Sequence, residues 1–210
     1  MELNLKGKTA LITGASSGIG KAIKEGLEKE GVKVIHWDKE EGIDLMANCT
    51  IGLRKIMQKD IDNCDILINN VGGLGSFIPK NYPEYNIIFD MNAGNMQILT
   101  MAYLSILRKY GRVITISSIY GKEKGHNPFF TASKSYQIAF MKSLAGKYPN
   151  ITFNTICPGH IDVGKPFPDN PKVIGKPEDV ANIVVFLCSD LASHINGACI
   201  TVDGGVSHSF

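Results

Sequence analysis

The sequence predicts an α/β fold in which a parallel sheet is covered by helices on both faces. Short, continuous apolar runs alternate with segments of helical periodicity from one end of the 210-residue chain to the other. Continuous apolar runs are typical of parallel strands buried on both faces, and their alternation with helices predicts right-handed βαβ crossovers. No linker, internal repeat or low-complexity tract interrupts the pattern, so residues 1–210 are predicted to form a single domain.

The predicted strands are short apolar runs that end at turn-forming residues. Gly14 stops the first run and Pro158-Gly159 closes the fifth. The runs that we assign to strands are residues 9–13, 32–37, 65–69, 112–117, 151–157 and 198–202.

The predicted helices show apolar residues three or four positions apart. Gly31 ends the first helix, Gly111 breaks the third, and Pro128 lies in the first turn of the fourth, where proline is tolerated. The helices are predicted at residues 19–30, 51–59, 85–109, 128–148 and 177–189, and a loop rich in proline, glycine and aspartate spans residues 160–175.

The composition is that of an ordinary globular protein, with 44% hydrophobic and 20% charged residues. The net charge is +2 and no lysine- and arginine-rich run occurs, so neither nucleic acid nor an acidic membrane is expected as a partner. No segment approaches the roughly 18 apolar residues of a membrane span. Residues 1–8 lack a signal-peptide core, and a cytoplasmic protein is therefore expected.

Five cysteines are scattered along the chain. None forms a C-x-x-C pair or lies at metal-ligand spacing from a histidine, so no metal site is expected. They are predicted to be isolated small apolar residues in a reducing compartment. Cys157, which precedes the Pro158-Gly159 loop, is the one candidate for a reactive thiol.

The turn after the first predicted strand has a dinucleotide-binding pattern. Residues 13–20 read Thr-Gly-Ala-Ser-Ser-Gly-Ile-Gly, and their glycines allow a tight turn and the close approach of a phosphate. The helix that follows directs free N–H groups and the positive end of its dipole at that phosphate. The alternative is a tight turn without a ligand, but the position between a strand and a helix makes the signal specific. The residues predicted to bind the cofactor here are Gly14, Ser16, Ser17, Gly18, Ile19 and Gly20.

Asp38 ends the second predicted strand, eighteen residues after Gly20. A carboxylate at this place accepts hydrogen bonds from ribose hydroxyls and repels a 2′-phosphate, which favours NAD over NADP. Lys39 follows and softens the repulsion, so NADP stays open, as does the alternative that Asp38 is a surface turn carboxylate. Asp44 and Leu45 are predicted to contact the adenine, because a carboxylate can accept from its exocyclic amine.

Seven segments of the chain follow one another in a recognisable pattern: residues 13–20, Asn69-Asn70-Val71-Gly72, Asn92, Ser117-Ser118, Ala132-Ser133-Lys134, Pro158-Gly159 and Thr201-Val-Asp-Gly-Gly205. Through these segments the chain resembles, over essentially its whole length, the short-chain dehydrogenase/reductase family. The resemblance implies a Rossmann-type, doubly wound sheet of about seven strands in the order 3-2-1-4-5-6-7. It also implies hydride transfer between NAD(P) and a small-molecule carbonyl or secondary alcohol, in a homodimer or homotetramer often built from the long helices at 85–109 and 128–148.

The resemblance assigns four residues to the surroundings of the cofactor. Asn70 and Gly72 match the turn that lines the adenine-ribose side and steadies the sheet. Pro158 and Gly159 match the turn that lies against the nicotinamide. Val163 departs from the family, which often has a threonine there to contact the carboxamide. The departure should weaken cofactor orientation only modestly, because a backbone N–H can still serve.

The resemblance also assigns catalytic roles. Asn92 matches the asparagine that holds a proton-relaying water, and Ser118 matches the serine that hydrogen-bonds the substrate oxygen. Lys134 matches the lysine that holds the nicotinamide ribose and lowers the pKa of a neighbouring phenol. Phe130, twelve residues after Ser118 and four before Lys134, stands where the family has its catalytic tyrosine. Phenylalanine offers no proton, and a positioned acid or base is worth roughly 10²–10⁴-fold in rate.

Three residues are candidates to supply the proton that Phe130 lacks, besides Ser118 with a water. Tyr120 begins a Y-x-x-x-K match with Lys124, but the glycine and charges between them predict a loop, so the two side chains need not share a helical face. His126 and His160 lie in loops near the cleft, and histidine suits proton transfer near neutral pH. The alternative for each histidine is a surface loop residue.

Two functional hypotheses follow. Retention of Asn92, Ser118 and Lys134 favours an oxidoreductase with a displaced or missing proton donor. Phe130 favours a catalytically inactive dinucleotide-binding protein with a sensing or partner-subunit role. Natural loss, a replacement acid and an engineered change are all compatible with Phe130.

No substrate is indicated, because the loop after the fifth strand is brief and shapes few contacts. Leu74, Phe77, Ile78 and Phe167 could form an apolar wall, or could simply pack the loops.

Overall fold

The computed structural model describes residues 2–38, 60–73, 80, 82–105, 110–164, 166–167 and 171–209. Within them, six strands form one parallel sheet in the order β2-β1-β3-β4-β5-β6. The strands are β1 (Thr9–Thr13), β2 (Lys33–Trp37), β3 (Ile66–Asn69), β4 (Gly111–Ile116), β5 (Ile151–Pro158) and β6 (Cys199–Val202). All six were predicted from the sequence, each to within one residue at either end.

The strand order agrees with the implied order 3-2-1-4-5-6-7 once its third strand is left out. That strand would follow β2 in the chain, within residues that the structure does not describe. The predicted helix at 51–59, the adenine contacts Asp44 and Leu45, and the wall residues Leu74, Phe77 and Ile78 also lie outside the described residues. The order reverses between β1 and β3, and doubly wound sheets bind ligands at the carboxyl ends of the strands at such a point.

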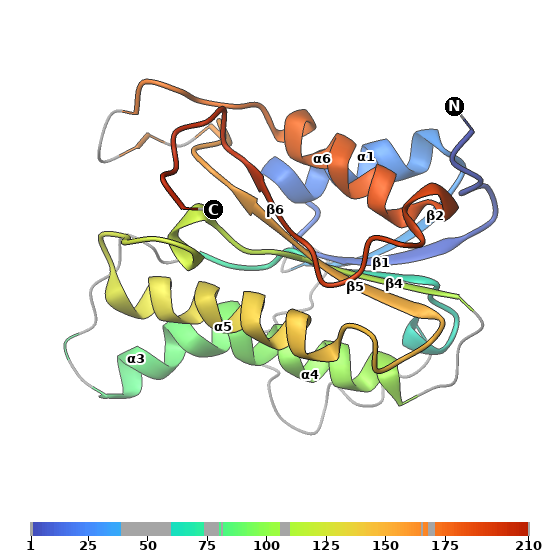
Figure 1. Cartoon of the computed structure of the whole chain (residues 1–210), viewed down its shortest axis with the longest axis horizontal. Coiled ribbons are helices and arrows are strands. Elements are labelled where there is room, and N and C mark those ends of the chain that lie inside the picture. Colours follow the sequence, from blue (N-terminus) through green and yellow to red (C-terminus); the bar gives the residue numbers. More distant parts are fainter. Residues whose placement is uncertain are drawn as a thin grey trace.

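Helices cover both faces of the sheet, as Figure 1 shows. On one face lie α1 (Gly18–Lys29) and α6 (Pro177–Cys188). On the other lie α3 (Tyr82–Phe89), α4 (Asn95–Leu104) and α5 (Pro128–Leu144), and short 3₁₀ turns occur at Ile119–Gly121 and Asp190–Ala192. No helix in the described part of the chain is both long and apolar enough to cross a membrane.

Two predicted helices differ from the observed ones. The predicted helix at 85–109 is divided by a π-helical turn, Asp90–Gly94, which separates α3 from α4. The helix predicted to reach residue 148 ends at Leu144, because Ala145 leaves the helical region with ψ of 132° and Gly146 follows with φ of +78°. Apolar periodicity alone reveals neither a wide turn nor a chain reversal made by backbone dihedrals.

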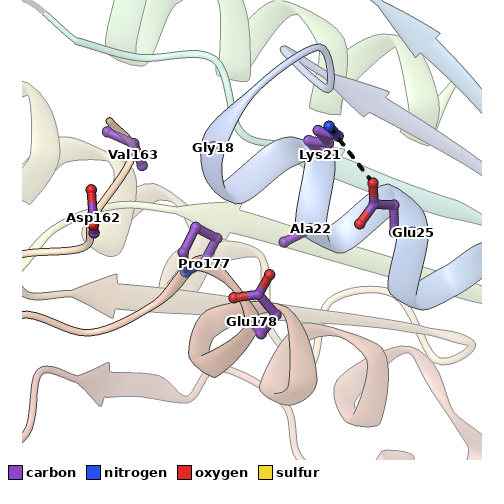
Figure 2. Close-up of a pocket in the computed structure, with 8 residues that line it drawn as sticks. All are labelled: Gly18, Lys21, Ala22, Glu25, Asp162, Val163, Pro177 and Glu178. Carbon is purple, nitrogen blue, oxygen red and sulfur yellow. Dashed lines mark ion pairs between the residues drawn. The ribbon is translucent and has the colours of Figure 1, made fainter. Parts of the chain in front are cut away.

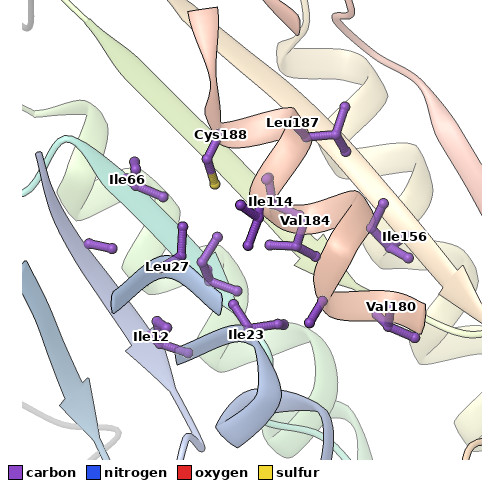
Figure 3. Close-up of a cluster of buried hydrophobic side chains, with 14 of the residues drawn as sticks. Ile12, Ile23, Leu27, Ile66, Ile114, Ile156, Val180, Val184, Leu187 and Cys188 are labelled. Atoms are coloured by element: carbon purple, nitrogen blue, oxygen red, sulfur yellow. The ribbon is translucent and has the colours of Figure 1, made fainter. Parts of the chain in front are cut away.

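The apolar core is divided by the sheet into two clusters, because successive residues of a strand point to opposite faces. In β1, Ile12 packs against α1 and α6, whereas Leu11 packs against the other helical layer. The first cluster, with Ile23, Leu27 and Val184 at the contact of α1 and α6, is shown in Figure 3. The two helical layers support the carboxyl ends of the strands, where the candidate site lies.

Candidate active site

The glycine-rich turn joins β1 to α1 at the carboxyl end of the sheet. Gly14 and Gly18 have φ of +70° and +54°, values that residues with a side chain rarely adopt. A Cβ on Gly20 would lie 2.0 Å from the carbonyl oxygen of Gly14, so glycine is required for this close approach. Within the described residues, no side-chain oxygen caps the N-terminus of α1 at Ser17. A tight turn with three glycines, at an uncapped helix N-terminus, fits the diphosphate of a dinucleotide.

Asn70 ties this turn to the end of β3. Its Nδ2 donates to the carbonyl oxygens of Thr13 and Gly14, at 3.0 and 2.8 Å. In return, Oγ1 of Thr13 accepts from the backbone N–H groups of Asn70 and Val71, at 3.0 and 3.1 Å. The four hydrogen bonds fix the crevice between β1 and β3, so Asn70 positions the turn whether or not it also touches a nucleotide.

Asp38 lies directly beside the same turn. Its Oδ2 accepts a hydrogen bond of 3.0 Å from the backbone N–H of Ser16. The carboxylate is therefore joined to the predicted phosphate-binding turn, where a ribose-binding residue is needed. The side chain of Ile19 is partly buried and packs against the apolar core.

Asn92 lies in the π-helical turn and is fully buried. Its side-chain amide forms a pair of hydrogen bonds with the backbone of Gly73, both 3.0 Å long. A Cβ on Gly72 would lie 2.7 Å from Oδ1 of Asn92 and 3.0 Å from Nζ of Lys134. Three residues that are far apart in the sequence therefore meet at one point, as the predicted site requires.

Lys134 lies on α5 with its side chain buried. Its Nζ donates to the carbonyl oxygen of Ile116 at 3.1 Å. Burial lowers the pKa of Lys134 to about 8, and the neighbouring Cys157 opposes this shift. Phe130 precedes Lys134 by one helical turn, and its ring centroid lies 5.5 Å from Nζ. The aromatic ring faces the ammonium group, but it carries no hydroxyl group.

Ser118 follows β4 and begins the 3₁₀ turn Ile119–Gly121, with its Oγ accepting from the backbone N–H of Tyr120 at 3.2 Å. The phenol oxygen of Tyr120 lies 3.4 Å from Nε2 of His160. The ring of Tyr120 also packs edge-on against His126, at a centroid distance of 6.1 Å. The three candidate proton donors therefore form one cluster beside Ser118. Lys124 lies outside any helix, as predicted for this Y-x-x-x-K match.

The turn after β5 is a further part of the candidate site. The backbone N–H of Gly159 donates to the carbonyl oxygen of Val202 at 3.0 Å, which ties Pro158-Gly159 to the end of β6. A Cβ on Gly18 would lie 2.9 Å from Cγ1 of Val163. The loop that carries Val163 thus packs against the glycine-rich turn.

A cavity of about 260 Å³ lies beside this contact, between the N-termini of α1 and α6 (Figure 2). Sequence reasoning did not predict it. Its charged lining is mostly acidic, and its one ammonium group is 3.9 Å from a carboxylate of the same helix, so the cavity does not suit a phosphate. The lining residues are Gly18, Lys21, Ala22, Glu25, Asp162, Val163, Pro177 and Glu178.

The prediction that Cys157 is the candidate reactive thiol is wrong. Its side chain is fully buried, and its pKa is raised by a hydrogen bond with Cys199 and by burial. Cys199, which the sequence did not single out, has the lowered pKa. Among the described residues, no group of three side chains is placed to hold a metal ion.

Comparison with known proteins agrees with the fold and the motifs. The family model described as enoyl-(acyl carrier protein) reductase matches residues 50–207. The chain is 32% identical to 3-oxoacyl-[acyl-carrier-protein] reductase of Escherichia coli (strain K12), over 97% of this chain and 99% of that protein. It is also 32% identical to acetoacetyl-CoA reductase of Shinella zoogloeoides, over 94% and 98%.

Solved structures show the same architecture. Ligand-free aldohexose dehydrogenase of Thermoplasma acidophilum is 26% identical and superposes with a TM-score of 0.83, covering 98% of this chain and 96% of that one. With the sheet order and the glycine-rich turn, these matches show that the chain belongs to the short-chain dehydrogenase/reductase family.

Proposed function

We propose that the protein transfers hydride between a nicotinamide dinucleotide and a small-molecule carbonyl or secondary alcohol. The observation that carries this proposal is the meeting of Asn92 and Lys134 at Gly72, beside the end of β4 where Ser118 lies. A buried lysine with a lowered pKa costs stability, and strongly perturbed titratable groups of this kind are typical of catalytic sites.

The cofactor is proposed to lie along the carboxyl end of the sheet. The glycine-rich turn would hold its diphosphate, Asp38 its adenosine ribose and Lys134 its nicotinamide ribose. Asp38 favours NAD, since its carboxylate repels the 2′-phosphate of NADP. When bound, the dinucleotide supplies or accepts the hydride, and the residues of the chain manage the proton.

The proton donor is proposed to be Tyr120, supported by His160. In the reducing direction, hydride reaches the carbonyl carbon and the oxygen develops into an alkoxide, which Ser118 orients by hydrogen bonding. The phenol of Tyr120 gives its proton to that oxygen, and His160 restores the proton from solvent. The 3.4 Å separation of the Tyr120 oxygen and His160 Nε2 supports this assignment. Tyr120 lies two residues from Ser118, which brings it to the same cleft.

The substrate proposed for a first assay is a 3-oxoacyl thioester. The two relatives described above carry names that describe reduction of such a compound, attached to acyl carrier protein or to coenzyme A. In this chain the substrate class rests on those names alone. The described part of the cleft adds one apolar contact, the edge-on packing of Phe167 and His160 at 5.1 Å between ring centroids.

Self-association through the helices opposite α1 and α6 is part of the proposal. Four large apolar side chains of α3 and α4 are 40–47% exposed. A homodimer or homotetramer would cover them. They are Ile87, Phe89, Ile98 and Met101.

The test measures binding and turnover separately. NADH and NADPH are titrated by fluorescence, and acetoacetyl-CoA with a panel of ketones is assayed on the parent, Tyr120→Phe, Phe130→Tyr and the double variant. We expect Tyr120→Phe to lower kcat/KM by roughly 10²–10⁴-fold, and Phe130→Tyr to restore turnover in that background.

Two outcomes would contradict the proposal. Turnover that appears only after Phe130→Tyr would mean that the parent lacks a proton donor, and would favour the binding protein without dehydrogenase activity. Failure to bind either dinucleotide would overturn the proposed function altogether.

A further inference from the structure

Two cysteine side chains meet at the edge of the sheet, close to the active site. Cys157 lies on β5 and Cys199 on β6, and their sulfur atoms are 3.3 Å apart. Cys157 pairs in register with Thr201, and Cys199 pairs with Thr155. Residues two apart on a strand point to the same face, so both thiols lie on one side of the sheet.

The two thiols have different environments. Cys157 is fully buried and cannot easily ionise, whereas Cys199 is partly exposed. The hydrogen bond between the two sulfurs, opposed by burial and aided by Lys122, lowers the pKa of Cys199 to about 7. The ammonium group of Lys122 is held in place by Thr201 Oγ1 at 3.0 Å. Cys157 and Lys122 are the titratable groups that act on Cys199 from the neighbouring elements.

We propose that Cys199 and Cys157 form a thiol–disulfide switch, with Cys199 as the attacking thiolate. A hydroperoxide is the oxidant. The sulfur of Cys199 attacks its O–O bond, becomes a sulfenic acid and releases hydroxide or alkoxide, which takes a proton from solvent. The thiol of Cys157 then attacks the sulfenic sulfur, the S–S bond forms and water leaves. The two sulfurs are oxidised by two electrons, and the peroxide is reduced.

The second step, in which the S–S bond forms, takes place at the edge of the described sheet. The sulfurs must approach from 3.3 Å to about 2.05 Å. The two cysteines are two positions out of register, so the bond requires the two strands to move relative to one another. β6 is the last strand of the described sheet and pairs there with β5 alone, which makes it the strand that can shift.

The switch would act on the site proposed for hydride transfer. The backbone of Ser118 and the ammonium group of Lys134 both lie close enough to the thiol of Cys157 to interact with it electrostatically. β5 continues from Cys157 into Pro158, and the end of β6 is hydrogen-bonded to Gly159. A bond between the two cysteines therefore changes the support of both catalytic side chains and of the nicotinamide turn.

The first test is chemical and does not depend on activity. Iodoacetamide labelling is followed from pH 5.5 to 9.5 by mass spectrometry, after cleavage by trypsin and by a protease specific for the N-terminal side of aspartate. The peptide of residues 190–202 then carries Cys199, that of 148–161 carries Cys157, and that of 179–189 carries Cys188. Cys188 is fully buried with a raised pKa and serves as the internal control.

We expect labelling of Cys199 to reach half its maximal rate near pH 7, and at that pH to exceed the rate of an unperturbed cysteine about three- to five-fold. Cys157→Ala should move this midpoint upward by more than one pH unit, and Cys188 should stay unlabelled in the native protein. A midpoint of Cys199 above pH 8.5 in the parent, or one unchanged by Cys157→Ala, would overturn the proposal.

The second test looks for the bond itself. Treatment with stoichiometric hydrogen peroxide should join peptides 148–161 and 190–202 with the loss of two hydrogen atoms, and dithiothreitol should separate them. Cys199→Ser should abolish the cross-link and leave Cys157 reduced. Oxygen added to peptide 190–202 without a cross-link, or a cross-link to another cysteine, would contradict the switch.

Discussion

The candidate site has two halves that lie at the same end of the sheet but are held by different means. In the binding half, the turn between β1 and α1 is fixed by backbone geometry and by the hydrogen bonds among Thr13, Gly14 and Asn70. In the catalytic half, a buried ammonium group faces an aromatic ring that has no hydroxyl. The binding half is part of what makes the chain fold, whereas the catalytic half costs stability. Substitutions in the two halves should therefore separate stability from turnover.

Gly20→Ala should have the largest effect on the binding half. The added Cβ would lie 2.0 Å from the carbonyl oxygen of Gly14 and 2.5 Å from Nδ2 of Asn70, so the helix or the turn must move. We expect a loss of more than about 3 kcal/mol in the free energy of unfolding, because backbone atoms cannot yield as a flexible side chain can. Urea unfolding measures the loss, and NADH titration should show no binding.

Gly146→Ala is the matched control for this substitution. Gly146 has a positive φ of +78°, but no described atom lies within 4 Å of the position that a Cβ would take. The loss in the free energy of unfolding should therefore come only from the strained backbone conformation and be about 1 kcal/mol. Equal losses for the two variants would mean that close packing does not fix the glycine-rich turn.

Thr13→Val should have the next largest effect. Valine keeps the shape but removes the oxygen that accepts from the N–H groups of Asn70 and Val71. Leaving these donors without a partner should cost about 2–3 kcal/mol in the free energy of unfolding. Thr152→Val is the control, since Oγ1 of Thr152 is buried without a hydrogen-bond partner in the described structure. We expect that variant to be neutral or slightly more stable, and a cost equal to that of Thr13→Val would contradict the argument.

In the catalytic half, Lys134→Met should raise the free energy of unfolding, whereas the substitutions in the binding half lower it. The pKa of Lys134 is about 8 in the folded protein, against about 10.4 in an unfolded chain, so burying the charge costs roughly 3 kcal/mol at pH 7. The lost hydrogen bond to Ile116 offsets about 1 kcal/mol of the gain. The variant should therefore be about 1–2 kcal/mol more stable at pH 7, while turnover falls.

The pH dependence checks the cause of that gain. Between the folded and the unfolded pKa, from about pH 8 to about pH 10.4, the unfolded parent binds more protons than the folded parent, so the stability of the parent rises with pH. The advantage of Lys134→Met should shrink across this window. Urea unfolding of both proteins at pH 7 and pH 10 measures the change, and an advantage that stays constant would rule out desolvation of Lys134 as its origin.

The sequence predicted the sheet better than the site. The strands could be read from runs such as Ile66 to Asn69 because a buried parallel strand must be apolar along its whole length. Asn92, Ser118 and Lys134 were identified by resemblance, and their placement at one end of the sheet follows from the strand order. The π-helical turn around Asn92 was not predicted, since the five residues of Asp90–Gly94 include too few apolar side chains for a change of period to be detected.

The thiol pair shows a different limit of prediction from the sequence. Cys157 and Cys199 are far apart in the sequence, and their meeting depends on the register of β5 against β6. Neither cysteine has a nearby partner in the chain that spacing rules could recognise. Sequence reasoning therefore chose Cys157 by its position, whereas the hydrogen bond and Lys122 make Cys199 the ionisable one.

Phe130→Tyr should have the smallest effect on stability and gives the sharpest comparison. Phe130 is half-buried and its ring faces Lys134, so an added hydroxyl should change the free energy of unfolding by less than about 0.5 kcal/mol. Since the pKa of Lys134 is about 8, the ammonium group and the new phenol should titrate as a coupled pair, and attraction between the charged lysine and the phenolate should let part of the phenol ionise below the usual tyrosine pKa of about 10. Difference absorbance near 295 nm against the parent isolates its titration. A new phenol that shows no ionisation below about pH 10, or one that destabilises the protein by about 2 kcal/mol, would show that a hydroxyl at residue 130 does not lie near Lys134. In that case the absence of a hydroxyl at residue 130 could not explain any difference in chemistry between this chain and its family.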